Sequence, residues 1–148
     1  MATINGCNLP EDVSYLIEKH VWAKEMEGGV IRVGMTSVAG KLSGGKLAAV
    51  TVKTKAIGQE VAQGKSVATV ESSKFVGPVP APVTGVLLRG NDKLASDPNI
   101  AISDPYGEGW IAEIQPSNWD AEKGSLLSGS AGVAAYQKKL EEENISCN

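Results

Sequence analysis

The chain has 148 residues, of which 42% are hydrophobic, enough for one globular domain with a sizeable core. Its net charge of −3 excludes the basic field that binds nucleic acid, and no apolar run approaches the roughly 20 residues that span a bilayer. The N-terminus also lacks the features of a secretory signal, so we expect a cytoplasmic protein. Seventeen glycines and seven prolines favour a turn-rich β architecture.

The first predicted element is a short helix over residues 10–19. Pro10 occupies a helix-start position, and acidic residues follow it in the first turn. Val13, Leu16 and Ile17 fall on one face of such a helix.

Residues 20–54 predict a hairpin, a second short helix and a strand. The glycine pair at 28–29 suits a primed turn between strands 20–27 and 30–36. The helix, residues 37–42, is expected to be capped by Ser37 and ended by the glycine pair at 44–45. The strand is predicted over residues 47–54.

Lys74 lies between two β-type runs, residues 67–70 and 82–88. This placement predicts a lysine at or near a hairpin tip, with its ammonium pointing away from the barrel. Such a lysine is a poor buried charge and a good covalent attachment point, although an ordinary solvated turn lysine is the alternative. Gly85 is expected where a second backbone passes closely.

Three elements are predicted after residue 100. Residues 104–107 predict a type I turn that leads into a last strand, residues 110–114. Residues 115–129 are polar and turn-rich. A terminal helix over residues 131–143 places its apolar residues at spacings of three and four.

No arrangement for self-contained catalysis is evident, so we expect a non-catalytic protein. His20 is interpreted as a packed or hydrogen-bonded residue, because no nucleophile or second base accompanies it. Cys7 and Cys147, near opposite ends, are expected to be free and inert in a reducing cytosol, with a redox role as the alternative. With one histidine and two distant cysteines, no metal site is predicted.

The residues around Lys74 resemble those of the lipoyl/biotinyl carrier domains. Residues 57–71 space glycine and valine as these domains do before the modified lysine, and residues 81–87 match the strand after it. The resemblance implies a mainly β fold, a flattened barrel (barrel-sandwich hybrid) that displays the lysine on a hairpin. Biotinyl domains have methionine on both sides of the lysine, whereas Ser73 and Phe75 flank it here, so the implied cofactor is lipoate on Lys74.

Other segments are similar to the glycine-cleavage H-protein family. They are residues 103–110, the triplet His20-Val21-Trp22 and residues 33–36. The resemblance covers about residues 20–116 and implies a single lipoyl-carrier domain over residues 1–148, with short N-terminal and C-terminal helices, the latter at about 131–143.

Several positions depart from the family pattern. Val21, Phe75, Gly77 and Pro78 replace an acid, an alanine, a serine and an aspartate, and Lys46, Lys53 and Lys55 stand in a segment that is usually acidic. An aminomethyl cargo carries an ammonium that needs acceptors, and three candidate acceptors are missing. The departures favour an H-like lipoate-binding protein that carries sulfur equivalents for a heterodisulfide-reductase-like sulfur oxidation complex.

Two alternatives remain. One is a glycine cleavage system H protein, whose implied partners are glycine decarboxylase, aminomethyltransferase and dihydrolipoamide dehydrogenase. The other is an unmodified β-barrel interaction module. The sulfur carrier and the glycine cleavage carrier would both need a lipoate–protein ligase. We expect the protein to be a monomer.

Overall fold

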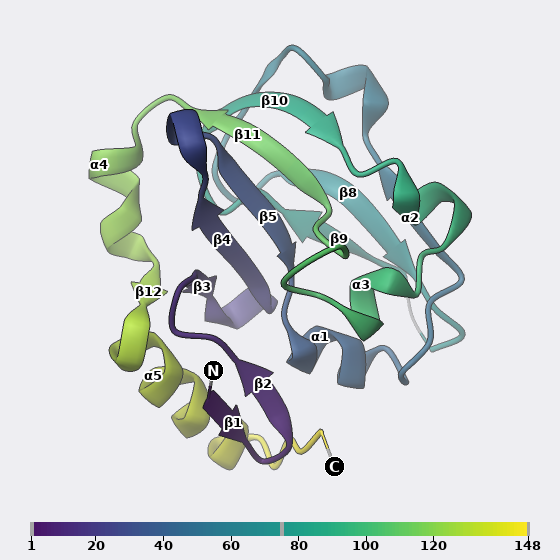
Figure 1. Cartoon of the computed structure of the whole chain (residues 1–148), viewed down its shortest axis with the longest axis vertical. Coiled ribbons are helices and arrows are strands. Elements are labelled where there is room, and N and C mark those ends of the chain that lie inside the picture. The colour runs from purple at the N-terminus through teal and green to yellow at the C-terminus, as the bar shows by residue number, and fades with distance from the viewer. Residues whose placement is uncertain (1, 75, 148) are drawn as a thin grey trace.

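The computed structural model describes residues 2–74 and 76–147, and its architecture is mainly β (Figure 1). Within these residues the strands are β1 (Ala2–Ile4), β2 (Cys7–Leu9), β3 (Ser14–Leu16), β4 (Val21–Glu25), β5 (Ile31–Met35), β6 (Ala49–Val52), β7 (Glu60–Val61), β8 (Ser66–Glu71), β9 (Val76–Pro80), β10 (Gly85–Gly90), β11 (Ala112–Pro116) and β12 (Leu127–Ser128). The α-helices are α1 (Ser37–Leu42), α2 (Lys93–Ser96), α3 (Ile100–Ser103), α4 (Trp119–Glu122) and α5 (Gly129–Glu142). Four single-turn 3-10 segments are η1 (Ile17–Lys19), η2 (Glu27–Gly29), η3 (Thr54–Ala56) and η4 (Lys123–Ser125).

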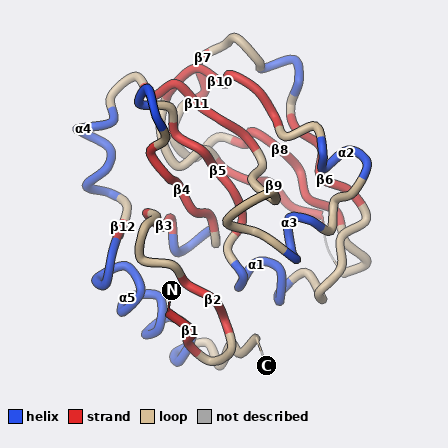
Figure 2. Tube along the Cα trace, in the orientation of Figure 1, coloured by secondary structure: helices blue, strands red, loops and turns tan. Residues whose placement is uncertain are grey.

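The described strands form three sheets. The largest has the order β12-β3-β4-β5-β11-β10-β7, the second is β6-β8-β9, and β1 pairs with β2. Figure 2 shows most of the strands gathered in the middle of the molecule, the β1–β2 hairpin at one end and the helices at the periphery. A continuous cluster of buried side chains, almost all aliphatic, joins the two larger sheets. The predicted flattened barrel is confirmed.

The predicted hairpin around the glycine pair is confirmed. Strands β4 and β5 pair antiparallel from Val21 opposite Met35 to Glu25 opposite Ile31. Gly28 and Gly29 each have φ of +80°, a region that costs a residue with a Cβ atom.

Helix α1 occupies the predicted residues, but its cap is Thr36 rather than Ser37. The Thr36 side chain accepts a hydrogen bond from the Ala39 N–H at 3.4 Å. The helix ends at Leu42, shortly before Gly44 and Gly45, whose φ values are +90° and +82°.

The helix predicted over residues 10–19 is wrong. Residues 14–16 form β3, which pairs with β4, and only Ile17–Lys19 forms a helical turn. Val13 and Tyr15 are buried with Ser14 between them, which is the period of a strand. Pairing with the sheet therefore overrides the local helix signals.

The structure also corrects which strand pairs with the one before Lys74. The hairpin closes between β8 and β9, whereas β10, which contains most of the run predicted over residues 82–88, belongs to the other sheet. Strand β9 was not predicted, because it contains Pro78 and Pro80, which cannot donate to a ladder. Both are tolerated because β9 is an edge strand of its sheet.

Cys7 and Cys147 form a disulfide, with 5.0 Å between their Cα atoms, so the expectation of free cysteines is wrong. They are 140 residues apart in sequence, and folding brings the two ends of the chain together. The Cys147 N–H donates to the Asn5 carbonyl at 2.8 Å, beside the β1–β2 turn.

The disulfide borders a second buried cluster, here called the terminal cluster. Its members come from the β1–β2 hairpin, β3 and the residue before it, β4, α1 and α5: Cys7, Leu9, Val13, Tyr15, Trp22, Val38, Val133, Tyr136 and Leu140. Helix α5 begins two residues before its predicted start and buries the face expected of it. None of the described helices is both long and apolar enough to cross a membrane.

Candidate functional site

Lys74 lies in the turn between β8 and β9, and its side chain is exposed. The last paired residues on either side are Glu71 and Val76. The Lys74 N–H donates to the Ser72 hydroxyl at 3.2 Å, which holds the turn. The hairpin-tip position is confirmed, and Phe75, its other neighbour, lies outside the described residues.

The loop after α1 supports the Lys74 stem. A Cβ atom on Gly44 would lie 3.2 Å from both Cδ and Cε of Lys74. This glycine therefore lets the loop approach the methylene stem closely. The terminal amine, which forms no ion pair with any described residue, remains available for an amide bond.

A pocket of about 220 Å³ lies beside this hairpin and is here called the hairpin pocket. It is lined by Glu18, Lys19, His20, Val21, Met35, Ala39, Leu42, Val70, Gly77, Pro78 and Val79. The structure thus brings together His20, Val21, Gly77 and Pro78, four residues that the sequence analysis singled out. The three lysines noted in the usually acidic segment do not line it.

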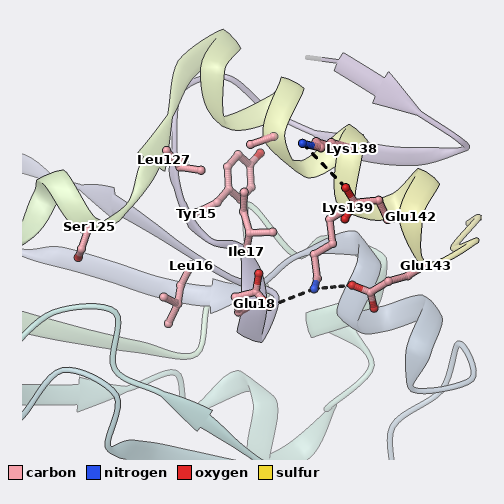
Figure 3. Close-up of a pocket in the computed structure, with 11 residues that line it drawn as sticks. Tyr15, Leu16, Ile17, Glu18, Ser125, Leu127, Lys138, Lys139, Glu142 and Glu143 are labelled. Atoms are coloured by element: carbon pink, nitrogen blue, oxygen red, sulfur yellow. Dashed lines mark hydrogen bonds and ion pairs between the residues drawn. The ribbon is translucent and has the colours of Figure 1, made fainter.

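Glu18 supplies a carboxylate to this pocket, which the sequence analysis missed. Its side chain is mostly exposed, and Oε2 pairs with Lys139 Nζ at 3.2 Å. Figure 3 shows this pair from a neighbouring pocket, where Lys139 lies between Glu18 and Glu143. No local signal identifies the pair, because its members are 121 residues apart.

His20 is hydrogen-bonded, as predicted. Its Nδ1 lies 2.5 Å from the Tyr136 hydroxyl, which in turn lies 2.8 Å from the Thr36 hydroxyl. Burial lowers the pKa of His20, and the nearby Lys139 ammonium lowers it further. The imidazole is therefore kept neutral at physiological pH.

The three sequence segments that resemble the H-protein family meet in space. Trp22 is fully buried, and its indole N–H donates to the Pro105 carbonyl at 3.0 Å. The predicted turn is closed by the Gly107 N–H, which donates to the Asp104 carbonyl at 3.2 Å. Gly34 lies against Trp22, since a Cβ there would be 2.6 Å from the indole ring. These contacts position the strand that begins beside His20.

Comparisons with known proteins agree with this arrangement. The family model described as glycine cleavage H-protein matches residues 14–143. The chain is 42% identical over 151 residues to glycine cleavage system H protein 5 of Aquifex aeolicus, covering 99% of each chain. It is 38% identical over 149 residues to the probable glycine cleavage system H protein 2 of Sulfurisphaera tokodaii, covering 99% of this chain and 98% of the relative.

A solved structure has the same fold. The crystal structure of a glycine cleavage system H protein from Mycobacterium marinum superposes with a TM-score of 0.73 at 32% identity, covering 93% of this chain and 100% of that one. These names refer to glycine cleavage, so they favour the alternative interpretation over sulfur transport.

Proposed function

Because the chain belongs to the glycine cleavage H-protein family, whose members carry lipoate covalently on a lysine, we propose that Lys74 bears the lipoyl group. We further propose that the protein is a non-catalytic carrier of the glycine cleavage system, moving the aminomethyl group between glycine decarboxylase and aminomethyltransferase. The observation that carries the proposal is the exposed Lys74 at the β8–β9 tip, beside a pocket.

The residues around Lys74 fit a swinging arm. When bound, lipoate supplies a disulfide in a five-membered ring. An unstrained disulfide prefers a torsion of about ±85–100°, which so small a ring cannot reach. The S–S bond is therefore strained and easily opened. The β8–β9 hairpin holds the attachment point outward, and Gly44 leaves room for the stem. Tethering raises the local concentration of the arm at partner active sites.

The attachment site is tested by mass spectrometry of protein from its native source. We expect one lipoyl-amide mass increment, located on the Lys74 peptide. Lys74→Arg keeps the charge and should abolish the increment, whereas Lys65→Arg, in the turn before β8, should leave it intact. An increment elsewhere, or unmodified native protein, would overturn the proposal.

Sulfur transport remains a second candidate because of the chemistry of the hairpin pocket. Val21, Gly77 and Pro78 offer no side-chain acceptor to an ammonium, the carboxylate of Glu18 is already paired with Lys139, and the imidazole of His20 brings no negative charge. A sulfur cargo would need no such acceptor.

A glycine–bicarbonate exchange assay with glycine decarboxylase separates the two candidates. The lipoylated protein is compared with an authentic H protein at equal lipoylation, checked by intact mass. Exchange close to the control rate supports the glycine cleavage proposal. Little or no exchange, with disulfide exchange toward small thiols intact, would support the sulfur carrier.

A further inference from the structure

His20 has a feature that a passive carrier does not require. Its backbone lies in the left-handed region, with φ of +57° and ψ of +44°, which is uncommon for a residue other than glycine. The conformation is held by its N–H, which donates to the Ile17 carbonyl at 3.2 Å. Strained residues of this kind concentrate at functional sites. Here the strain places an imidazole in the wall of the hairpin pocket.

The other side of the ring is held by buried hydroxyls. Tyr136 and Thr36 are fully buried, and Thr36 also accepts the Ala39 N–H that caps α1. The two contacts permit either direction of donation. In the direction proposed here, His20 Nδ1–H donates to Tyr136 Oη, and the Tyr136 hydroxyl donates to Thr36 Oγ1. In this tautomer Nε2 carries a lone pair and is the ring nitrogen left for a ligand.

The charged groups near the ring come from two elements. Glu18 and Lys19 of η1 line the pocket, and Lys139 of α5 and Glu143, which caps the C-terminus of α5, act on the ring electrostatically. The wall contributed by β8 and β9, the strands that flank Lys74, has no charged side chain among its described residues. A neutral imidazole therefore lines the same pocket as an uncharged wall made by the two strands that flank Lys74.

We propose that His20 Nε2 accepts the proton of a thiol on the reduced lipoyl arm of Lys74. The proton leaves sulfur for Nε2 and the electron pair stays on sulfur, which gives a thiolate beside an imidazolium. When that thiolate displaces a leaving group from an electrophile, the new bond to sulfur forms as the bond to the leaving group breaks, and the imidazolium gives its proton to the leaving group, which restores the neutral ring. The inference rests on the proposed lipoylation of Lys74 but not on the identity of the cargo.

The first experiment uses the unlipoylated full chain. His20 is the single histidine, so its two ring nitrogens can be assigned in a ¹⁵N NMR titration without ambiguity. We expect the neutral ring to carry its proton on Nδ1, and Tyr136→Phe to shift the population toward the other tautomer. A neutral ring protonated on Nε2 in the wild type would overturn the inference, whatever the state of Lys74.

The second experiment follows alkylation by iodoacetamide across pH. The lipoylated protein is reduced, and label is counted on the Lys74 peptide alone, so that Cys7 and Cys147 do not contribute. A thiol acting alone should react about tenfold faster per pH unit until it is fully ionised. With His20 as proton acceptor, the alkylation rate of the wild type should instead be constant over the pH range between the pKa of the imidazole and the pKa of the thiol.

His20→Asn should remove the plateau and slow alkylation at pH 7 by about tenfold. Asparagine tolerates the left-handed conformation, so the fold should be kept, which a thermal melt checks. Lys19→Ala is the matched control. It removes a positive charge that lines the pocket, so it can shift the pH at which the thiol ionises, but the alkylation rate should still show the plateau. If Lys74 is lipoylated and the His20→Asn profile matches the wild type, the inference fails; if Lys74 carries no lipoate, the proposed function fails.

Discussion

The two buried clusters of this molecule are built differently. The cluster between the larger sheets is almost entirely aliphatic, as where Ile31 of β5 faces Ile114 of β11. The terminal cluster contains Tyr15, Trp22 and Tyr136, and it is bordered by a disulfide. In the first, burial of apolar area is the main source of stability. In the second, hydrogen bonds and a covalent link hold segments that are far apart in sequence.

The difference bears on the candidate site. The barrel displays Lys74, but the polar side of the hairpin pocket depends on the terminal cluster. His20 is held by Tyr136, and Glu18 by Lys139, both from α5. Damage to the barrel should therefore unfold the carrier, whereas damage to the terminal cluster should also alter the pocket.

The largest effect is expected from the disulfide. Cys7→Ser removes a link that closes a loop of 140 residues, which in the chain-entropy account should lower the free energy of unfolding by roughly 4–5 kcal/mol. Urea denaturation with and without reductant measures it. Reductant should destabilise the wild type and leave the variant unchanged. Equal denaturation midpoints for oxidised and reduced wild type would show that the terminal cluster does not depend on the link.

Next is Gly85→Val, which tests the barrel. A Cβ at Gly85 would lie 2.2 Å from the Gln115 carbonyl oxygen on β11, so we expect a loss of about 3 kcal/mol from overpacking. Gly28→Ala is the control, because a Cβ there has no neighbour within 4 Å. Only its positive φ should matter, at a cost of about 1–2 kcal/mol. Equal or reversed losses in denaturant would contradict the strand alignment.

A smaller effect is expected for Tyr136→Phe. The hydroxyl links His20 and Thr36, and its removal leaves both without this partner, so the loss should be about 1–2 kcal/mol. Thermal unfolding followed by circular dichroism measures it. Leu140→Met, in the same cluster, changes shape without removing a hydrogen bond. A loss for Tyr136→Phe no larger than for this control would show that the hydroxyl network is not stabilising.

The smallest effect is a pH dependence due to His20. Burial and Lys139 lower its pKa in the folded state below the ordinary value of 6.5. Below pH 6.5 the unfolded chain therefore binds this proton first, and the free energy of unfolding should fall as pH decreases toward the folded pKa. Above pH 6.5 the contribution is fully present. Between pH 7.5 and 5.5, His20→Asn should reduce the slope of the free energy of unfolding against pH. An unchanged slope would show that other groups cause the pH dependence.

Much of the barrel was predictable from the sequence because its signals are local. Alternating apolar residues, the glycine pair at 28–29 and the turn at Asp104 each specify a conformation within a few residues. The same holds for the display of Lys74, which follows from turn residues between strands. Sequence reasoning went wrong over residues 10–19 and at β9, where pairing with a sheet decided the outcome.

The chemical surroundings of the site required the tertiary structure. Cys7 meets Cys147, His20 meets Tyr136 and Glu18 meets Lys139, pairs that are 140, 116 and 121 residues apart. No periodicity or motif connects such positions, because the chain between them can adopt many paths and only the packed α5 selects one. The sequence alone therefore determined the fold class and the displayed lysine, and the tertiary structure determined which groups surround that lysine.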